Sequence, residues 1–214
     1  MMGRKDKSDI RKPEILDHLQ RVMATEGIEG TTLAKVAKSM GVNSGLLIHY
    51  FKSKEEMIIA MVDRLVDIYG NLYLQKLAKY EAPEARLEFI MDTIFKVDPM
   101  LRENDSVFYA CYVMSFRNNR IRSRFKHMFD RFRAQLSKEI ESFINAGIVK
   151  VTDPVKTADI MITVIEGINF YRTMLVDDDK IEETAAYFEN SIRDLLNNGE
   201  TDTPNIKNTK ESRT

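Results

Sequence analysis

The sequence predicts an all-α protein in two parts, a three-helix head and a larger helical domain that follows it. Apolar residues recur at spacings of three and four along nearly the whole chain, which is typical of amphipathic helices. No segment shows the sustained alternation of apolar and polar residues that a strand requires. With 214 residues and 43% hydrophobic content, the chain is long enough to bury a large core.

The first helix of the head is expected to begin near Pro13, because proline favours the first turn of a helix. Gly27 and Gly30 would end it. Its apolar residues lie on one side, where they can pack on other helices: Ile15, Leu16, Leu19, Val22 and Met23. The residues before Pro13 carry more cations than anions and form a basic arm suited to lie along phosphates, or else a solvated tail: Arg4, Lys5, Lys7, Arg11 and Lys12.

Two short helices and one long helix are expected next. Thr31 or Thr32 is placed to cap the second helix. Gly41 then supplies the left-handed backbone that a sharp turn needs, and Asn43 caps the third helix. Residues 53–56 have the spacing of a capping box and begin the long helix that joins the head to the larger domain.

Proline and glycine also mark the helices of the larger domain. Pro83 and Pro99 separate two of them, and the segment 105–116 is markedly aromatic. The expected helices lie at roughly 84–96, in a short piece after Pro99, and at roughly 122–145, 155–175 and 180–196. Almost no apolar residue follows, so a disordered tail is expected. The predicted division is a head at 9–54, a larger domain at 55–197 and a tail at 198–214.

The head has the pattern of a helix-turn-helix, in which the second of two short helices enters the major groove of DNA. On the third helix of the head, Leu47, Tyr50 and Phe51 mark the inward face. The residues that turn outward or lie on its flanks are Ser44, Gly45, Leu46, Ile48 and His49. Small residues at the start of this helix permit a close approach to base edges, His49 can donate a hydrogen bond, and Leu46 or Ile48 can pack on thymine methyl groups.

The run ILDHLQRVMATEGIEGTTLAKVAKSMGVNSGLLIHYFKSKEEMI resembles the DNA-binding domain of the tetracycline-repressor (TetR) family. The features in register are the Glu-Gly turn after the first helix, Thr31-Thr32, Val36-Ala37, Gly41-Val42 and the run from Leu47 to Glu56. The resemblance implies a dimeric helical protein, with a DNA-reading head and a C-terminal domain that dimerises and often holds a small effector.

The resemblance also assigns roles by position. Thr32 would cap the second helix near a phosphate, and Tyr50 and Lys54 would touch the DNA backbone. The full set of expected DNA contacts is Thr32, Lys35, Asn43, Ser44, Gly45, Leu46, Ile48, His49, Tyr50 and Lys54. The chain departs from the family at Ile48, where tyrosine is usual, and at Ala34, where many members have a polar residue. Either the basic arm and Lys35 contribute more here, or nonspecific affinity is weaker.

In the larger domain, the family's layout implies a homodimer through the helices at 122–145 and 155–175, which would match a palindromic operator. Aromatic and methionine residues would line an effector cavity, or else simply form core: Met91, Phe95, Phe108, Tyr109, Tyr112, Phe116, Tyr171 and Met174. A group of cations forms a solvated face, or binds an anionic effector or an acidic partner: Arg117, Arg120, Arg122, Arg124, Lys126, Arg131 and Arg133. The expected effector is therefore small and either apolar or anionic.

The function expected from these features is that of a dimeric repressor, released from its operator by a small-molecule effector. The alternative is a DNA-binding regulator controlled by a protein partner or by oligomerisation. An enzyme is not expected, because His18, His49 and His127 are isolated and no residues have the spacing of a catalytic, metal or cofactor site.

The expected location is the cytoplasm, without a membrane partner. No segment is apolar enough to span a bilayer, and the first residues lack the apolar region of a signal peptide. The formal net charge of −1 does not by itself indicate a polyanion partner. The single cysteine, Cys111, stands among aromatic residues and is expected to be a small buried apolar side chain.

Overall fold

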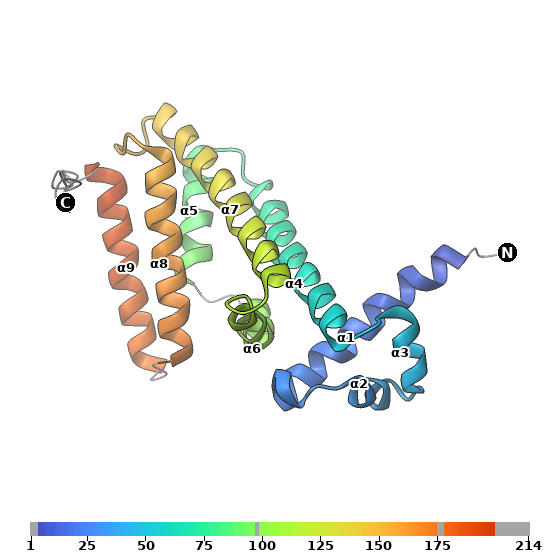
Figure 1. The fold of residues 1–214 in the computed structure, drawn as a ribbon. Coiled ribbons are helices and arrows are strands. Elements are labelled where there is room, and N and C mark those ends of the chain that lie inside the picture. Colours follow the sequence, from blue (N-terminus) through green and yellow to red (C-terminus); the bar gives the residue numbers. More distant parts are fainter. Residues whose placement is uncertain (1–3, 97–98, 175–177, 200–214) are drawn as a thin grey trace, which may run out of the picture. The chain divides into compact units, whose positions relative to one another are not determined.

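The computed structural model describes residues 4–96, 99–174 and 178–199, and this part of the chain is helical without any strand (Figure 1). The predicted all-α fold is therefore confirmed. The described helices are α1 (Arg4–Gly30), α2 (Leu33–Met40), α3 (Ser44–Tyr50), α4 (Lys54–Leu77), α5 (Pro83–Phe95), α6 (Pro99–Met114), α7 (Asn119–Asn145), α8 (Pro154–Met174) and α9 (Asp178–Asn198).

The start of α1 differs from the sequence prediction. The helix begins at Arg4 and passes through Pro13, so the predicted basic arm is helical. Proline inside a helix removes one backbone donor and crowds the carbonyl of the turn before it, and an ion pair of 2.6 Å between Arg11 and Glu14 spans the position. The end of α1 agrees better, because Gly27 has φ 70° and ψ 171° and breaks the helix where a break was predicted. The segment after Pro99 also differs, since it forms one continuous helix, α6.

The predicted caps of the two short helices are confirmed. Thr32 accepts a hydrogen bond of 3.2 Å from the Lys35 backbone N–H at the start of α2. Gly41 follows α2 with φ 68° and ψ 28°, the left-handed conformation that the turn requires. The Asn43 side chain accepts a hydrogen bond of 2.8 Å from the Gly45 N–H at the start of α3. These local bonds fix where α2 ends and α3 begins.

The helices belong to two compact units, which lie within residues 1–76 with 97–132 and within 77–96 with 133–214. The first unit contains α1 to α3, nearly all of α4, α6 and the first half of α7. The second contains α5, α8, α9 and the rest of α7. The predicted division at residue 54 separates a DNA-binding head from a dimerisation and effector domain. It stays a prediction. Most of the predicted tail, residues 200–214, lies outside the described residues.

Each unit has an apolar core of its own. In the first unit the buried side chains include Ile15, Leu16, Leu19, Val22, Met23, Val36, Leu47, Phe51, Met61, Leu65, Cys111 and Phe125. In the second they include Leu87, Ile90, Met91, Leu136, Ile140, Phe143, Met161, Ile168, Ile192 and Leu196. Burial of one such side chain contributes about 1.5–3 kcal/mol relative to an exposed position. The inward face predicted for the first helix is therefore confirmed.

A buried ion pair organises the second unit. The Arg86 guanidinium on α5 donates to both carboxylate oxygens of Glu139 on α7, at 2.8 and 2.5 Å. Its remaining nitrogen donates to the backbone oxygens of Leu77 and Tyr80, at 3.1 and 3.0 Å. Gln135 donates a further bond of 2.7 Å to Glu139. One side chain thus joins the end of α4, the turn after it, α5 and α7.

Replacing Glu139 with alanine should lower the free energy of unfolding by about 3 kcal/mol or more, because the half-buried Arg86 guanidinium loses its counter-charge. Arg133→Ala is the matched control on the same helix. Its pair with Asp159 is half-exposed on both sides, so the loss should stay below about 1 kcal/mol. Urea unfolding of both variants checks this, and losses of equal size would contradict it.

Candidate DNA-binding site

The two sides of α3 differ in exposure as the sequence predicts. Leu47 and Phe51 are buried in the core of the first unit. Ile48, by contrast, is 55% exposed, an unusual state for a large apolar side chain. Of the other outward positions, Gly45 and His49 are exposed, while Ser44 and Leu46 are half-buried. The structure therefore brings these residues together on one accessible face, and their contact with DNA stays a prediction.

Contacts with the rest of the head fix the position of α3. The Val42 N–H donates to the Ala37 oxygen at 3.0 Å and closes the turn from α2. The Tyr50 ring, which packs on the core, meets the His49 ring edge-on, with centroids 5.2 Å apart. From α1, the Lys12 ammonium lies 5.9 Å from the Phe51 ring centroid. Packing of its inner side on the core and of Phe51 against Lys12 of α1 thus sets the direction in which α3 presents its outer face.

Two of the predicted DNA contacts already bind within the head. Lys35 on α2 forms an ion pair with Glu26 on α1. Lys54, at the start of α4, donates through its ammonium group to the Ile28 oxygen at 2.6 Å and to the Glu29 oxygen at 3.4 Å. Both lysines therefore tie other helices to the last turn of α1. The charge of Lys35 is largely offset, so the prediction that it contributes more to DNA affinity is weakened.

Two exposed cations of the head were not among the predicted contacts. Lys38 lies on the outer side of α2, and Lys52 follows α3 by two residues. Neither ammonium group has a hydrogen bond or ion pair within the described part of the chain. Their position beside the two short helices was visible in the sequence, but their freedom from acidic partners was not. They are the exposed donors best suited to phosphates.

The start of α7 is bound to the start of α4 within the same unit. Asn118 accepts hydrogen bonds from the Arg120 and Ile121 N–H groups, at 2.9 and 3.2 Å, and so caps α7. Its amide nitrogen donates to Glu55 on α4 at 2.9 Å. Two turns after Glu55 on α4, Asp63 accepts a hydrogen bond of 2.6 Å from the Arg124 side chain. Helix α4 begins four residues after α3 ends, so these bonds act close to α3.

The predicted cationic face is mostly paired. Arg120 lies 3.7 Å from Glu55, Lys126 pairs with Asp130 at 2.6 Å, and Arg122 donates to backbone oxygens at 3.0 Å. Arg133 donates to both carboxylate oxygens of Asp159 at 2.5 Å. These contacts favour the solvated face over the anionic effector among the two interpretations of this segment.

The predicted effector residues fall into two groups. Met91 and Phe95 are buried in the core of the second unit, where Tyr171 is 52% exposed. The side chain of Met174 lies outside the described residues. In the first unit the aromatic residues form one cluster: Phe108 meets Tyr109, Tyr112 and Phe125, and Tyr112 meets Phe116, at centroid distances of 5.3–6.4 Å. Phe116 is 65% exposed at the edge of that cluster.

Cys111 is buried, and burial raises the pKa of its thiol to about 12, so it stays protonated at neutral pH. Among the described residues, no three His, Cys, Asp or Glu side chains are grouped to hold a metal ion. Within the same residues, no helix is long and apolar enough to cross a membrane.

Two family models match the chain over most of its length. The model for bacterial regulatory proteins of the tetR family matches residues 15–61, which contain the helix-turn-helix. The model for the tetracyclin repressor-like C-terminal domain matches residues 82–198, more than half of the chain. The chain belongs to the TetR family of transcriptional regulators. The resemblance on which the sequence analysis relied is thereby confirmed.

Individual transcriptional regulators are similar over most of the chain. The HTH-type transcriptional regulator BetI of Rhizobium meliloti is 22% identical over 183 residues, which are 86% of this chain and 88% of BetI. A regulator from Saccharomonospora viridis, solved in complex with choline, has a TM-score of 0.75 at 18% identity and covers 84% of this chain and 95% of its own. FadR from Bacillus subtilis, solved with stearoyl-CoA, has a TM-score of 0.62 at 19% identity. The match covers 85% of this chain and 95% of FadR.

The two departures from the TetR pattern have a structural consequence. Ile48 and Ala34 are both exposed, and neither side chain can donate a hydrogen bond to phosphate. Tyr50 packs on the core with only part of its surface accessible. We therefore expect the exposed ammonium groups of Lys38 and Lys52 to replace the missing donors.

Replacing Lys52 with alanine should weaken binding to every DNA sequence and lower the salt dependence of log K by about one unit, because one phosphate contact is lost. Substitution of Leu46 or His49 should instead change which bases are preferred. Gel-shift or anisotropy titrations at several salt concentrations measure both effects.

The control for the lysine is Lys138→Ala, because Lys138 is exposed on the second-unit part of α7 and far along the chain from α3. An unchanged salt slope in the Lys52 variant, or an equal change in the control, would contradict the assignment.

Proposed function

We propose that this TetR-family protein is a homodimeric repressor that leaves a palindromic operator when a small effector binds. The observation that carries the proposal is the outer face of α3, where Gly45, Ile48 and His49 are accessible while Leu47 and Phe51 hold the helix in place. A helix presented in this way fits the major groove, and two copies related by a two-fold axis fit two half-sites about 34 Å apart.

We place the dimer interface on α8 and α9. Four large apolar side chains of these helices are exposed, between 45% and 68%: Val155, Phe170, Tyr171 and Tyr187. Side chains of this kind are enriched at protein interfaces. The sequence prediction paired α8 with α7, but the second-unit part of α7, residues 133–145, exposes no large apolar side chain. Helix α9 exposes Tyr187 to 68%, so α9 is the better partner for α8.

The effector is proposed from the family and from two of its similar structures. The S. viridis regulator was solved with choline and B. subtilis FadR with stearoyl-CoA. These ligands differ in charge and size, so they support ligand control without deciding the ligand class for this chain. The alternative, control by a protein partner, is favoured by one observation, the exposed apolar pair Val113 and Phe116 on the first unit.

Effector control requires a path from the larger domain to α3. The bond between Asn118 and Glu55 joins the start of α7 to the start of α4, which follows the recognition helix. A ligand that binds one arrangement of these helices more tightly shifts the population toward it. A shift that changes the separation of the two recognition helices then lowers operator affinity.

The dimer assignment predicts that Tyr187→Glu, combined with Tyr171→Glu, weakens dimerisation and operator binding together, because a buried carboxylate would have no counter-charge. Analytical ultracentrifugation and gel shift measure the two effects. Val113→Glu is the matched control, since Val113 is equally exposed but lies on α6. Dimerisation that is unchanged in the double variant would exclude α8 and α9 as the interface.

Two variants of Asn118 separate its roles. Asn118→Ala removes both the cap of α7 and the donor to Glu55, whereas Asn118→Asp keeps a capping oxygen and places a carboxylate beside Glu55. We expect the alanine variant to lose about 1 kcal/mol of stability through the cap. Both variants should show altered operator release by effector in a gel shift. Normal release in the aspartate variant would exclude the bond to Glu55 as the path.

A further inference from the structure

One carboxylate of the second unit stands out by its surroundings. Glu166 lies in the middle of α8, and it is the only charged residue between Asp159 and Arg172. The turns before it, residues 160–165, contain only Thr163 as a polar residue. The Glu166 side chain is half-buried. An ionised group in such a place is normally paired, because water no longer solvates it fully.

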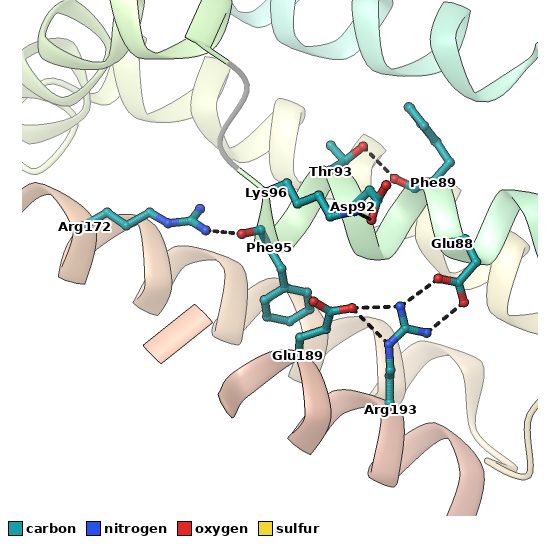
Figure 2. Close-up of polar contacts among 9 residues, drawn as sticks. All are labelled: Glu88, Phe89, Asp92, Thr93, Phe95, Lys96, Arg172, Glu189 and Arg193. Carbon is teal, nitrogen blue, oxygen red and sulfur yellow. Dashed lines mark hydrogen bonds and ion pairs between the residues drawn. The ribbon is translucent and has the colours of Figure 1, made fainter. Parts of the chain in front are cut away.

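The other half-buried or buried acids described in this unit are all paired. Their cations lie 2.5–2.8 Å away: Asp92 with Lys96, Glu139 with Arg86, Asp159 with Arg133 and Glu189 with Arg193. Figure 2 shows two of these pairs, with the Arg193 guanidinium between Glu189 and Glu88. Glu166 differs from these four acids, because it has no hydrogen bond or ion pair within the described part of the chain.

The cations at either end of this stretch of α8 are committed elsewhere. Arg133 binds Asp159 two turns before Glu166. Arg172 donates to the backbone oxygens of Phe95 and Ile94 at the end of α5, as Figure 2 shows for Phe95. Burial accordingly raises the pKa of Glu166, and no charged neighbour offsets the effect. Within the described part of a single chain, the Glu166 carboxylate thus has no counter-charge, and a bound cation would supply one.

We propose that Glu166 is the anionic anchor of the effector site, and that the effector is a small organic cation bearing an ammonium group. This inference rests on the proposed ligand control, and it chooses between the two ligand charges that the similar structures leave open. The apolar residues before Glu166 suit alkyl groups on the nitrogen, and an ammonium group supplies the missing counter-charge. The multiply charged phosphates of an acyl-CoA would instead be repelled by the carboxylate.

The test compares wild type with Glu166→Gln in calorimetric titrations and thermal shift, using choline, tetramethylammonium and butylammonium as probes. The uncharged dimethylbutanol isostere of choline, at matched ionic strength, controls for apolar binding. At least one cation should raise the Tm of the wild type, and its Kd should weaken about tenfold or more in the variant. The isostere should bind both proteins weakly and equally.

A second readout separates a ligand anchor from a structural residue. Because the native pKa of Glu166 is raised, its ionised form opposes folding above that pKa and the opposition vanishes as the pH falls through it. Without ligand, Glu166→Gln should therefore be at least as stable as wild type at neutral pH, with a gain that disappears in acid. Asp159→Asn is the matched control on the same helix: it should lose stability, because its pair with Arg133 is broken, and keep cation binding.

Several results would overturn the inference. One is a Glu166→Gln variant that is less stable than wild type and binds the cations unchanged, because the carboxylate would then be structural. A changed dimer dissociation constant with unchanged ligand binding would assign its counter-charge to a second copy of the chain. Operator release by stearoyl-CoA but by none of the three cations would overturn the cation class while leaving the proposed ligand control intact. Operator release by no ligand in either class would count against ligand control itself.

Discussion

The burial of Leu47 and Phe51 is the interaction on which the proposed DNA-binding surface depends. Helix α3 has seven residues, fewer than an isolated helix needs to be stable in water. It exists because Leu47 and Phe51 enter a core that also contains residues of α1, α2, α4 and α6. The same burial forces Ile48 and His49 outward. The exposed face of α3 is thus a consequence of core packing, and its shape depends on the buried residues Leu47 and Phe51.

Local chemistry explains which parts of this head could be predicted from the sequence. The caps at Thr32 and Asn43 and the turn at Gly41 depend on a few neighbouring residues, and the structure has them where the sequence indicates. The predicted start of α1 near Pro13 was wrong, because the helix continues through this proline although it removes one backbone donor. The roles of Lys35 and Lys54 were incomplete for a different reason. Their partners, Glu26 and the Ile28 oxygen, lie 9 and 26 residues away in the sequence, and only the fold brings them together.

The second unit was harder to predict, because its chemistry depends on pairing between helices. The sequence shows that Glu166 interrupts an apolar run, but it cannot show that Asp159 finds a cation while Glu166 does not. Apolar spacing likewise could not decide whether the aromatic and methionine residues line a cavity or form core, and in the structure Met91 is buried while Tyr171 is exposed. Periodicity identifies the apolar side of a helix, but it does not say whether another helix, a ligand or a second subunit covers it.

The composition of the first unit constrains how any signal could reach DNA. The head shares its core with α6 and the start of α7, so it is not packed as an independent module. Close-packed interiors resist small continuous deformations and move between discrete arrangements instead. A displacement of α7 therefore cannot be absorbed next to Asn118 without either breaking its bond to Glu55 or moving α4. Because Lys54 holds the start of α4 to the end of α1, a moving α4 must carry the supporting helix of the head with it. The unit should respond as a whole, which makes the orientation of the entire head, rather than the shape of α3, the quantity that an effector would change.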